Sequence, residues 1–367
     1  MPSPAASAEP GPEVPTPTGA PLRAALVGYG LAGRWFHRPL IGAQPGIEVV
    51  TVVTADAGRR AQAAQDLPGV ALLERPGELW RAEGHDLVVV ATPTATHRGL
   101  GAAALRRGLP VVMEKPLGPD RRQGAALAVL AAERGLGLFP FHNRRWDAEH
   151  LTLRRLLAEG TLGRVLRYES RFERWRPAPS PGAWREVPGT GAGVLLDLGV
   201  HLVDQALDLF GPVASVYGEV AARRGGADDD VFLALEHRAG VRSHLWAGAL
   251  AAAPGPRLRV LGSEGAFVAP FLDGQEAALR AGMQAGAPGF GVEPAERWGA
   301  LHRGDDATHP ATPVPSERGD WPAFYRQVVD ALVTGGPAPV GAGEALDVLE
   351  VLDAARLSAH RGRVVRL

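Results

Sequence analysis

The regular pattern of the chain begins at Leu22, where short apolar runs start to alternate with longer Ala-, Leu- and Arg-rich stretches of helical spacing. The run that begins at Leu87 is apolar throughout, as in a parallel strand covered on both faces, and we expect it near the middle of a sheet. Strands that alternate with helices predict a doubly wound parallel sheet. The runs that predict strands are Leu22–Val27, Ile47–Val53, Val70–Leu72, Leu87–Ala91, Val111–Met113 and Leu136–Phe139.

The rhythm changes after Phe141. A helical stretch near Ala148–Glu159 leads into longer alternating strands separated by short turns, which is typical of an antiparallel sheet. We therefore predict a second, α+β domain with a large, mainly antiparallel open sheet. The predicted strands are Val165–Trp175, Val213–Ala221, Val231–Glu236, Val241–Leu245 and Leu258–Leu261; a long loop is predicted over Gln284–Thr312, and helices over Trp321–Val333 and Glu344–His360.

These patterns divide the chain into a tail at 1–20, a parallel-sheet domain at 21–142 and an α+β domain at 143–367. The tail is mostly Pro, Ala, Ser, Thr and Gly, without a basic start or an apolar stretch, so we interpret it as disordered rather than as a signal peptide. No apolar run approaches the roughly 20 residues that span a bilayer. We therefore expect a cytoplasmic protein without membrane partners.

Composition narrows the partners and the chemistry. The 367 residues carry 39 Lys and Arg against 40 Asp and Glu, without a block of like charges, which argues against nucleic acid as the main partner. A small molecule is the better expectation. The chain has no Cys, which excludes disulfides, thiolate nucleophiles and Cys-ligated zinc. Any redox chemistry must come from a bound cofactor.

A glycine-rich loop follows the first predicted strand and opens a helix. It reads Gly28-Tyr29-Gly30-Leu31-Ala32-Gly33, the spacing of a dinucleotide-binding loop. In such loops the glycines permit a tight turn, close approach of the pyrophosphate and close packing of helix on strand, and the phosphates rest on the helix N-terminus. The alternative is an ordinary glycine-rich turn.

Asp56 follows the second strand, where a carboxylate typically binds the adenosine ribose of NAD and repels the extra phosphate of NADP. Arg59 and Arg60 lie just beyond it and could bind that phosphate instead. We favour NAD over NADP as the cofactor. Asp56 could also be a helix N-cap, and the two roles can coexist.

Two further strand ends should face the same crevice, because ligands of open parallel sheets bind beyond the carboxyl ends of the strands. The turn from Thr92 and Pro93 to His97 could pass beneath the nicotinamide ring, or it could only cap the next helix. The other strand end reads Glu114-Lys115-Pro116. Lys115 precedes Pro and should be extended, with its ammonium in the crevice or in a salt bridge.

The segment from Val194 to Phe210 predicts an apolar helix that ends at Gly211-Pro212 and carries a single polar stripe. We expect this stripe to be the open face of a mostly buried helix, in water or in a polar cleft. Asp197 and His201 stand one turn apart, so the carboxylate could orient the imidazole and raise its basicity. A metal site is not expected, since the helix offers no second His at ligand spacing. The stripe comprises Asp197, His201, Asp204, Gln205 and Asp208.

Together these parts suit the oxidation of a secondary alcohol, in which a nicotinamide accepts hydride and a base accepts the hydroxyl proton. We assign His201 as the proton acceptor and Asp197 as the group that orients it. Lys115 would hold the hydroxyl and stabilise charge that develops on its oxygen.

The glycine loop, the Glu114-Lys115-Pro116 strand end and the Asp197-to-His201 helix, in this order, resemble the Gfo/Idh/MocA oxidoreductase family. That family joins an N-terminal Rossmann domain to a C-terminal open-sheet domain, and the resemblance covers the chain from about Leu22 onward. Four segments look like the bacterial scyllo-inositol dehydrogenase branch of the family. They are Phe141–Asp147, Trp184–Glu186, Asp197–Gln205 and Asp273–Arg280.

The resemblance implies site residues and partners beyond those read from the pattern. It implies that the Glu114–Pro116 segment touches the nicotinamide portion and that the protein forms a homo-oligomer through its second sheet. Asp56 departs from relatives that use NADP, which typically have a basic residue at this point. The residues implied to line the substrate site are Asn143, Arg144, Trp184 and Arg185.

The sequence therefore predicts an NAD(P)-dependent dehydrogenase that acts on a ring hydroxyl of an inositol or sugar. A first alternative is a reductase of another keto-sugar or anhydrosugar. A second is a catalytically silent regulator that only binds the dinucleotide, although such a protein has no need of Lys115, Asp197 and His201 together.

Overall fold

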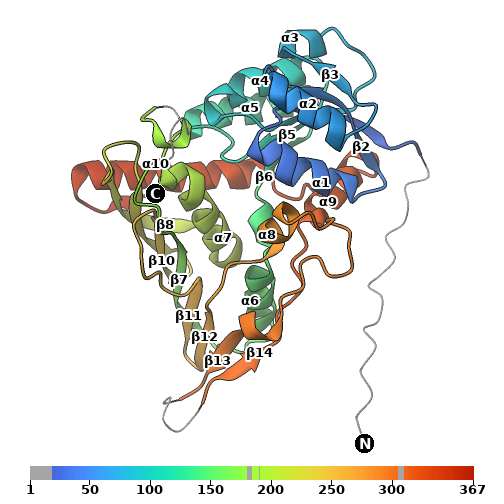
Figure 1. Cartoon of the computed structure of the whole chain (residues 1–367). Coiled ribbons are helices and arrows are strands. Elements are labelled where there is room, and N and C mark those ends of the chain that lie inside the picture. The colour runs from blue at the N-terminus through green and yellow to red at the C-terminus, as the bar shows by residue number, and fades with distance from the viewer. Residues whose placement is uncertain (1–18, 180–183, 190, 305–309) are drawn as a thin grey trace, which may run out of the picture.

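The computed structural model describes residues 19–179, 184–189, 191–304 and 310–367 (Figure 1). The tail predicted at 1–20 lies almost wholly outside the described residues. The described residues form two sheets, each with its own helices, and the long C-terminal helix α10 (Ala342–Arg361) packs against the helices of both parts (Figure 1).

The first sheet has six parallel strands in the order β3-β2-β1-β4-β5-β6, which confirms the doubly wound prediction. Strand β4 lies inside the sheet, and all four of its side chains are fully buried, as its apolar run indicates. The strands are β1 Leu22–Val27, β2 Ile47–Val53, β3 Ala71–Leu73, β4 Leu87–Val90, β5 Val111–Glu114 and β6 Leu138–Phe141.

Helices cover both faces of this sheet, and alternate residues of β1 enter two different cores. Ala25 and Val27 pack with α4 and α5, whereas Ala24 and Leu26 pack with α1. The connecting helices are α1 Arg38–Gly42, which follows a π-helical turn at Gly33–His37, α2 Ala57–Asp66, α3 Pro76–Leu79, α4 His97–Arg106 and α5 Arg121–Arg134.

The second sheet has nine strands in the order β14-β13-β12-β11-β7-β10-β9-β8-β15. Its neighbours are antiparallel except for β7 and β10, which run parallel, so the mainly antiparallel prediction is confirmed. Helices α7 (Val200–Phe210) and α10 (Ala342–Arg361) pack against it. The strands are β7 Val165–Glu173, β8 Val213–Ala221, β9 Asp230–His237, β10 Arg242–Gly248, β11 Leu258–Gly262, β12 Gly265–Ala269, β13 Gly299–His302, β14 Thr312–Val314 and β15 Val365–Arg366.

The predicted loop over Gln284–Thr312 is wrong in part, because it contains β13, which extends the sheet beside β12. Neither β12 nor β13 was predicted. Each has only four or five residues, and Gly interrupts or begins the apolar run that would mark it.

The end of the chain returns to the first domain. Phe324 and Tyr325 of α9 (Pro322–Val333) lie in the same core as Ala24 and Leu26. Helix α10 (Ala342–Arg361) lies along β8 and also contacts α5 (Figure 1). The α+β domain predicted at 143–367 therefore also supplies part of the first domain's packing. Across the described ranges, no helix has the length and hydropathy needed to cross a bilayer.

Candidate active site

Two cavities adjoin at the carboxyl ends of β1, β4 and β5. The glycine-loop cavity, of about 590 Å³, is lined by Gly28, Gly30, Thr92 and Lys115 among others. The interdomain cavity, of about 540 Å³, is lined by Lys115, Asp197 and His201 among others. Their common wall consists of Leu31, Ala32, Glu114, Lys115, Arg185 and Asp197.

The glycine loop has the shape that a pyrophosphate needs. Gly28 has φ +101°, and a Cβ there would lie 2.3 Å from the Ala91 carbonyl oxygen; at Gly33 it would lie 2.1 Å from the Gly28 carbonyl oxygen. Both positions therefore require glycine. At Gly30 the nearest atom would be 3.6 Å away, so the loop leaves open the space through which a ligand approaches the backbone. The loop fits a dinucleotide.

Most residues predicted to bind the cofactor line this cavity, but His97 does not. Its ring is fully buried, with Nδ1 2.9 Å from the Pro116 carbonyl oxygen and Nε2 2.9 Å from that of Thr92. Burial lowers the pKa of His97, so the ring is neutral and donates to one of these oxygens at a time. His97 therefore links the turn that contains Thr92 to the turn that contains Pro116, without lining the cavity itself. The predicted residues in the wall are Gly28, Gly30, Leu31, Ala32, Thr92, Pro93, Glu114, Lys115 and Pro116.

Asp56 acts as the N-cap of α2, where its Oδ1 accepts a hydrogen bond of 2.9 Å from the Arg59 amide. This was the alternative role considered for it. Asp56 is not in the cavity wall, whereas the Arg59 side chain is. Arg60 donates to the carbonyl oxygens of Thr54 and Ala55, so its guanidinium fixes the turn after β2.

Lys115 stands at the end of β5, before a cis peptide bond to Pro116. Its Nζ donates to the Asp197 carbonyl oxygen at 2.6 Å and to Asp197 Oδ1 at 3.0 Å. An ammonium has three donors, so one N–H remains for a ligand. Arg185 Nε lies 3.1 Å from the same Oδ1. Burial alone would raise the pKa of Asp197, but the charges of Lys115 and Arg185 outweigh it and hold that pKa well below its ordinary value.

The predicted pairing of Asp197 with His201 is wrong. The two cations draw the carboxylate toward Lys115, and Asp197 lies in a π-helical turn, Leu195–Gly199, that precedes α7 (Val200–Phe210). The wider turn changes the angular spacing that a regular helix would give. Asp197 therefore positions Lys115 rather than the imidazole.

His201 does face the interdomain cavity, as predicted, with 5% of its surface exposed. Its Nδ1 is buried and has no hydrogen-bond partner among the described residues. Burial, followed by the positive charges of Lys115 and Arg144, holds the pKa of His201 well below its ordinary value. The expected rise in basicity is thus a fall, and the ring is neutral at neutral pH.

The rest of the polar stripe is not an open face, contrary to our prediction. Asp204 and Gln205 are each 1% exposed. Arg145 forms a bidentate pair with Asp204, and Gln205 Nε2 donates to the Arg144 carbonyl oxygen at 2.7 Å. These partners come from the turn Asn143–Trp146 and make the burial of polar groups tolerable.

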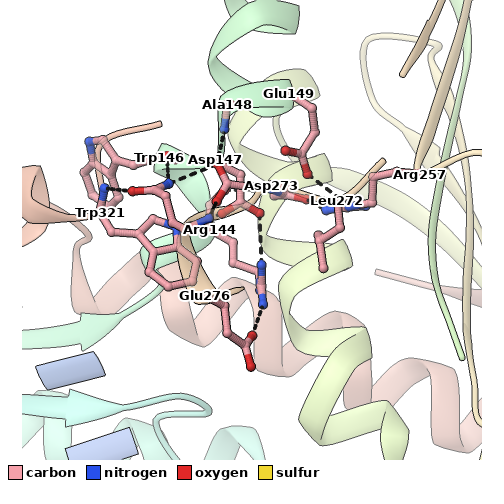
Figure 2. Close-up of polar contacts among 12 residues, drawn as sticks. Arg144, Trp146, Asp147, Ala148, Glu149, Arg257, Leu272, Asp273, Glu276 and Trp321 are labelled. Atoms are coloured by element: carbon pink, nitrogen blue, oxygen red, sulfur yellow. Dashed lines mark hydrogen bonds and ion pairs between the residues drawn. The ribbon is translucent and has the colours of Figure 1, made fainter. Parts of the chain in front are cut away.

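The same turn places Asn143 and Arg144 in the wall of the interdomain cavity. Arg144 is held by Asp147 and Glu276, each at 3.2 Å, and its guanidinium stacks over Trp321 (Figure 2). Sequence reasoning missed these three partners: Asp147 stands three residues after Arg144, whereas Glu276 lies in α8 (Gln275–Arg280) and Trp321 directly precedes α9. No local signal in the sequence links these segments.

Further residues of this cavity were also missed. Arg174 and Arg176 follow β7 and line the wall; their alternation around Trp175, the last residue of the predicted strand, was the available signal. The side chain of Trp184 lies outside the described residues, although its backbone begins a short turn with Arg185. Within the described ranges, no group of His, Asp and Glu has the arrangement of a metal site.

Models of two known domains match the chain. Residues 22–142 match an oxidoreductase family with an NAD-binding Rossmann fold, and residues 150–268 match the C-terminal domain of GFO/IDH/MocA proteins. Together they cover the first sheet, strands β7 to β11 of the second sheet, and the residues Lys115, Asp197 and His201.

Proteins similar along their whole length agree with this assignment. The scyllo-inositol 2-dehydrogenase (NADP(+)) IolW of Bacillus subtilis is 33% identical, over 94% of this chain and 96% of its own. The oxidoreductase YdgJ of Escherichia coli is 38% identical, over 93% and 97%. The solved structure of the oxidoreductase yvaA of Bacillus subtilis superposes with a TM-score of 0.89 at 32% identity, over 95% and 99%. The chain therefore belongs to the Gfo/Idh/MocA family of NAD(P)-binding oxidoreductases.

Proposed function

We propose that this protein is an NAD(P)-dependent dehydrogenase that interconverts a ring secondary alcohol and the corresponding ketone of an inositol-like polyol or a sugar. One observation carries the proposal: Lys115 and His201, distant in sequence, line one cavity, and Lys115 also lines the adjoining glycine-loop cavity. The 33% identity to an inositol dehydrogenase supports a cyclic polyol as the substrate.

Oxidation removes a hydride from the carbon of the alcohol and a proton from its oxygen. A bound nicotinamide would supply the hydride acceptor. The remaining N–H of Lys115 binds the hydroxyl oxygen and stabilises negative charge as the proton leaves. His201, held neutral, accepts that proton. Asp197, held ionised by Lys115 and Arg185, fixes the ammonium in place.

The test is to record absorbance of the reduced nicotinamide with a panel of inositols and sugars. We expect turnover by the wild type and a loss of about 100-fold or more in kcat for His201→Ala, since general-base catalysis contributes about 10²–10⁴-fold. Calorimetry should show that this variant still binds the dinucleotide. Full activity of His201→Ala would contradict the proposal, and dinucleotide binding without turnover of any substrate would favour a silent regulator.

We further propose that NADP is the preferred dinucleotide. Our preference for NAD depended on Asp56, which is not in the wall of the glycine-loop cavity, whereas Arg59 lines that wall close to Gly30. A guanidinium there suits a ribose phosphate. The relative IolW is named for NADP(+).

Replacing Arg59 tests this preference. We expect Arg59→Gln to lower kcat/KM for NADP by about 10- to 100-fold, the size of one charge-assisted hydrogen bond, and to leave NAD nearly unchanged. Arg98→Gln, which changes the same charge outside the cavity wall, is the control. An equal loss with both dinucleotides would contradict a phosphate contact.

A further inference from the structure

Two guanidinium groups in the wall of the interdomain cavity form no ion pair with the residues that the structure describes. The other cations of this wall are each paired with a carboxylate, as Lys115 and Arg185 are with Asp197. Arg174 and Arg176 have no side-chain hydrogen bond or ion pair with any described residue. The other paired cations are Arg144, Arg224 and Arg280.

The extended backbone after β7 directs the side chains of Arg174 and Arg176 to the same face. After β7 ends, the Arg174 amide donates to the Gly248 carbonyl oxygen at 2.9 Å, and the Arg176 amide donates to that of Ala249 at 2.7 Å. Trp175 lies between them in a β-bridge with Leu250. Alternate residues of an extended segment point to the same face, and both arginines line the cavity.

Holding the positive charges of Arg174 and Arg176 close together without an ion pair costs free energy when no ligand is bound. Arg174 is half-buried, and its burial, followed by the charge of Arg176, lowers the pKa of its guanidinium. Like charges side by side repel, and a partly desolvated cation loses hydration that no carboxylate replaces. The segment therefore has the electrostatics of an anion site that its ligand completes.

We propose that the substrate is an acidic cyclic polyol, which carries a carboxylate or phosphate group that Arg174 and Arg176 bind. This inference rests on the proposed function, since it names the class of molecule that occupies the same cavity. Lys115, Arg174 and Arg176 line the same cavity, so one ring can present its hydroxyl to Lys115 and its anionic group to the two arginines. The reaction is unchanged: the ring carbon gives hydride to the oxidised dinucleotide, the hydroxyl proton passes to His201, and the anionic group stays intact.

The test compares substrates that share one ring. D-Glucose, D-glucuronate and glucose 6-phosphate differ only in their neutral, carboxylate or phosphate group; myo-inositol and myo-inositol 1-phosphate form a second matched set. We expect kcat/KM for at least one acidic member to exceed that of its neutral partner by about 10- to 100-fold, and the better acid identifies the anion. Equal or better turnover of the neutral members overturns the inference.

Variants test whether the arginines are responsible. Arg174→Gln should raise KM for the acidic substrate about 10- to 100-fold, a clearly larger factor than for the neutral one, and added salt should weaken the difference. Arg242→Gln removes a charge from the exposed start of β10 in the same sheet and should change neither. Equal losses on acidic and neutral substrates would contradict an anion contact.

The thermal stability of Arg174→Gln distinguishes an anion contact from a structural role of this arginine. Loss of a structural contact would lower that stability, whereas loss of an anion contact would not. Because Arg174 forms no ion pair with a described residue, the midpoint of thermal unfolding of Arg174→Gln should equal or exceed that of the wild type without substrate. A clear fall would indicate a structural role and overturn the inference.

Calorimetry distinguishes a failure of the proposed reaction from a failure of the anion site. Binding of D-glucuronate or glucose 6-phosphate to the dinucleotide-loaded protein, lost in Arg174→Gln, would support the anion site even if none of the panel is oxidised. Such a result would place the failure with the proposed reaction. Turnover of neutral rings without binding of either acid would leave the reaction standing and overturn the anion site.

Discussion

At the scale of single residues, charge governs the site. Asp197 neutralises Lys115 and shares its carboxylate with Arg185, so little negative charge is left for the imidazole. His201 consequently lies among cations, in a wall that excludes most of the water. Its neutral form is favoured, which is the form that a proton acceptor needs.

This setting predicts the pH dependence of alcohol oxidation. Because the pKa of His201 lies well below 6.5, the ring stays neutral between pH 8 and 6.5, and kcat/KM should be flat over that range. The rate should fall only at lower pH, as the imidazole gains its proton. Initial rates in buffers of constant ionic strength provide the check, and an acid limb centred above pH 6.5 would contradict the burial effect.

The Asp197 contact makes a second prediction at this scale. Asp197→Asn keeps an acceptor oxygen near Lys115 but removes the counter-charge, so the ammonium should be less well fixed. We expect kcat to fall about 10- to 100-fold, with dinucleotide affinity changed less, as measured by steady-state kinetics and calorimetry. A variant whose kcat equals that of the wild type would show that the ion pair has no part in turnover.

At the scale of elements, short local signals predict the strands and helices, but partners distant in sequence decide how they are used. The strand end at Lys115 and the helix at His201 were predictable, because β-periodicity, Pro116 and the helix stop at Gly211 are local. The π-helical turn at Asp197 leaves no signature of its own. The contact from Arg185 depends on a segment that no spacing rule connects to α7.

Substitution of Gly28 tests whether the glycine-rich loop after β1 needs glycine to bind the dinucleotide. Gly28→Ala would place a methyl group against the Ala91 carbonyl oxygen and force an unfavourable positive φ. We expect weaker dinucleotide binding and a loss of unfolding free energy of about 1 kcal/mol or more. Gly99→Ala in α4, where a Cβ would meet nothing, is the matched control. Calorimetry and urea unfolding measure the two effects.

Helix α6 (Ala148–Ala158) carries a buried acidic group whose ionisation should affect stability. Burial and then the charge of Asp147 raise the pKa of Glu149 to about 8 and that of Asp273 to about 7 (Figure 2). The folded state therefore binds protons that the unfolded state has released. Their contribution is present at low pH and lost as pH rises through about 7 to 8.

We therefore predict that the free energy of unfolding falls as pH rises from about 5 to about 8, by up to about 1.4 kcal/mol per pH unit for each group while its carboxyl is still protonated in the folded state. Glu149→Gln keeps the acceptor for Arg257 and should flatten this dependence. Urea unfolding at several pH values measures the difference between variant and wild type. Parallel curves for the two proteins would mean that Glu149 is ionised throughout.

At the scale of the whole molecule, the two sheets do not form independent units. One hydrophobic core continues from α4 and α5 into the second sheet through α10 and α7, and the other is completed by α9. Sequence patterns predicted both sheets but not this return of the chain, because an amphipathic helix does not specify which neighbour its apolar face meets.

This packing predicts that the first domain needs the C-terminal helices. A chain ending at residue 142 lacks Trp321, Phe324 and Tyr325, which are fully buried against its sheet. It should bind an apolar dye and lack a cooperative thermal transition. The full chain should unfold in one step, with circular dichroism and tryptophan fluorescence giving coincident curves. Separate transitions would contradict this view.

The wall that the two cavities share has a kinetic consequence. Lys115, Glu114 and Leu31 border both spaces, so whatever occupies the first becomes part of the surface against which a molecule in the second must rest. The two ligands should then enter in a compulsory sequence, the dinucleotide leading and the polyol following. Reaction products should inhibit accordingly, with the reduced dinucleotide competing only against its oxidised form.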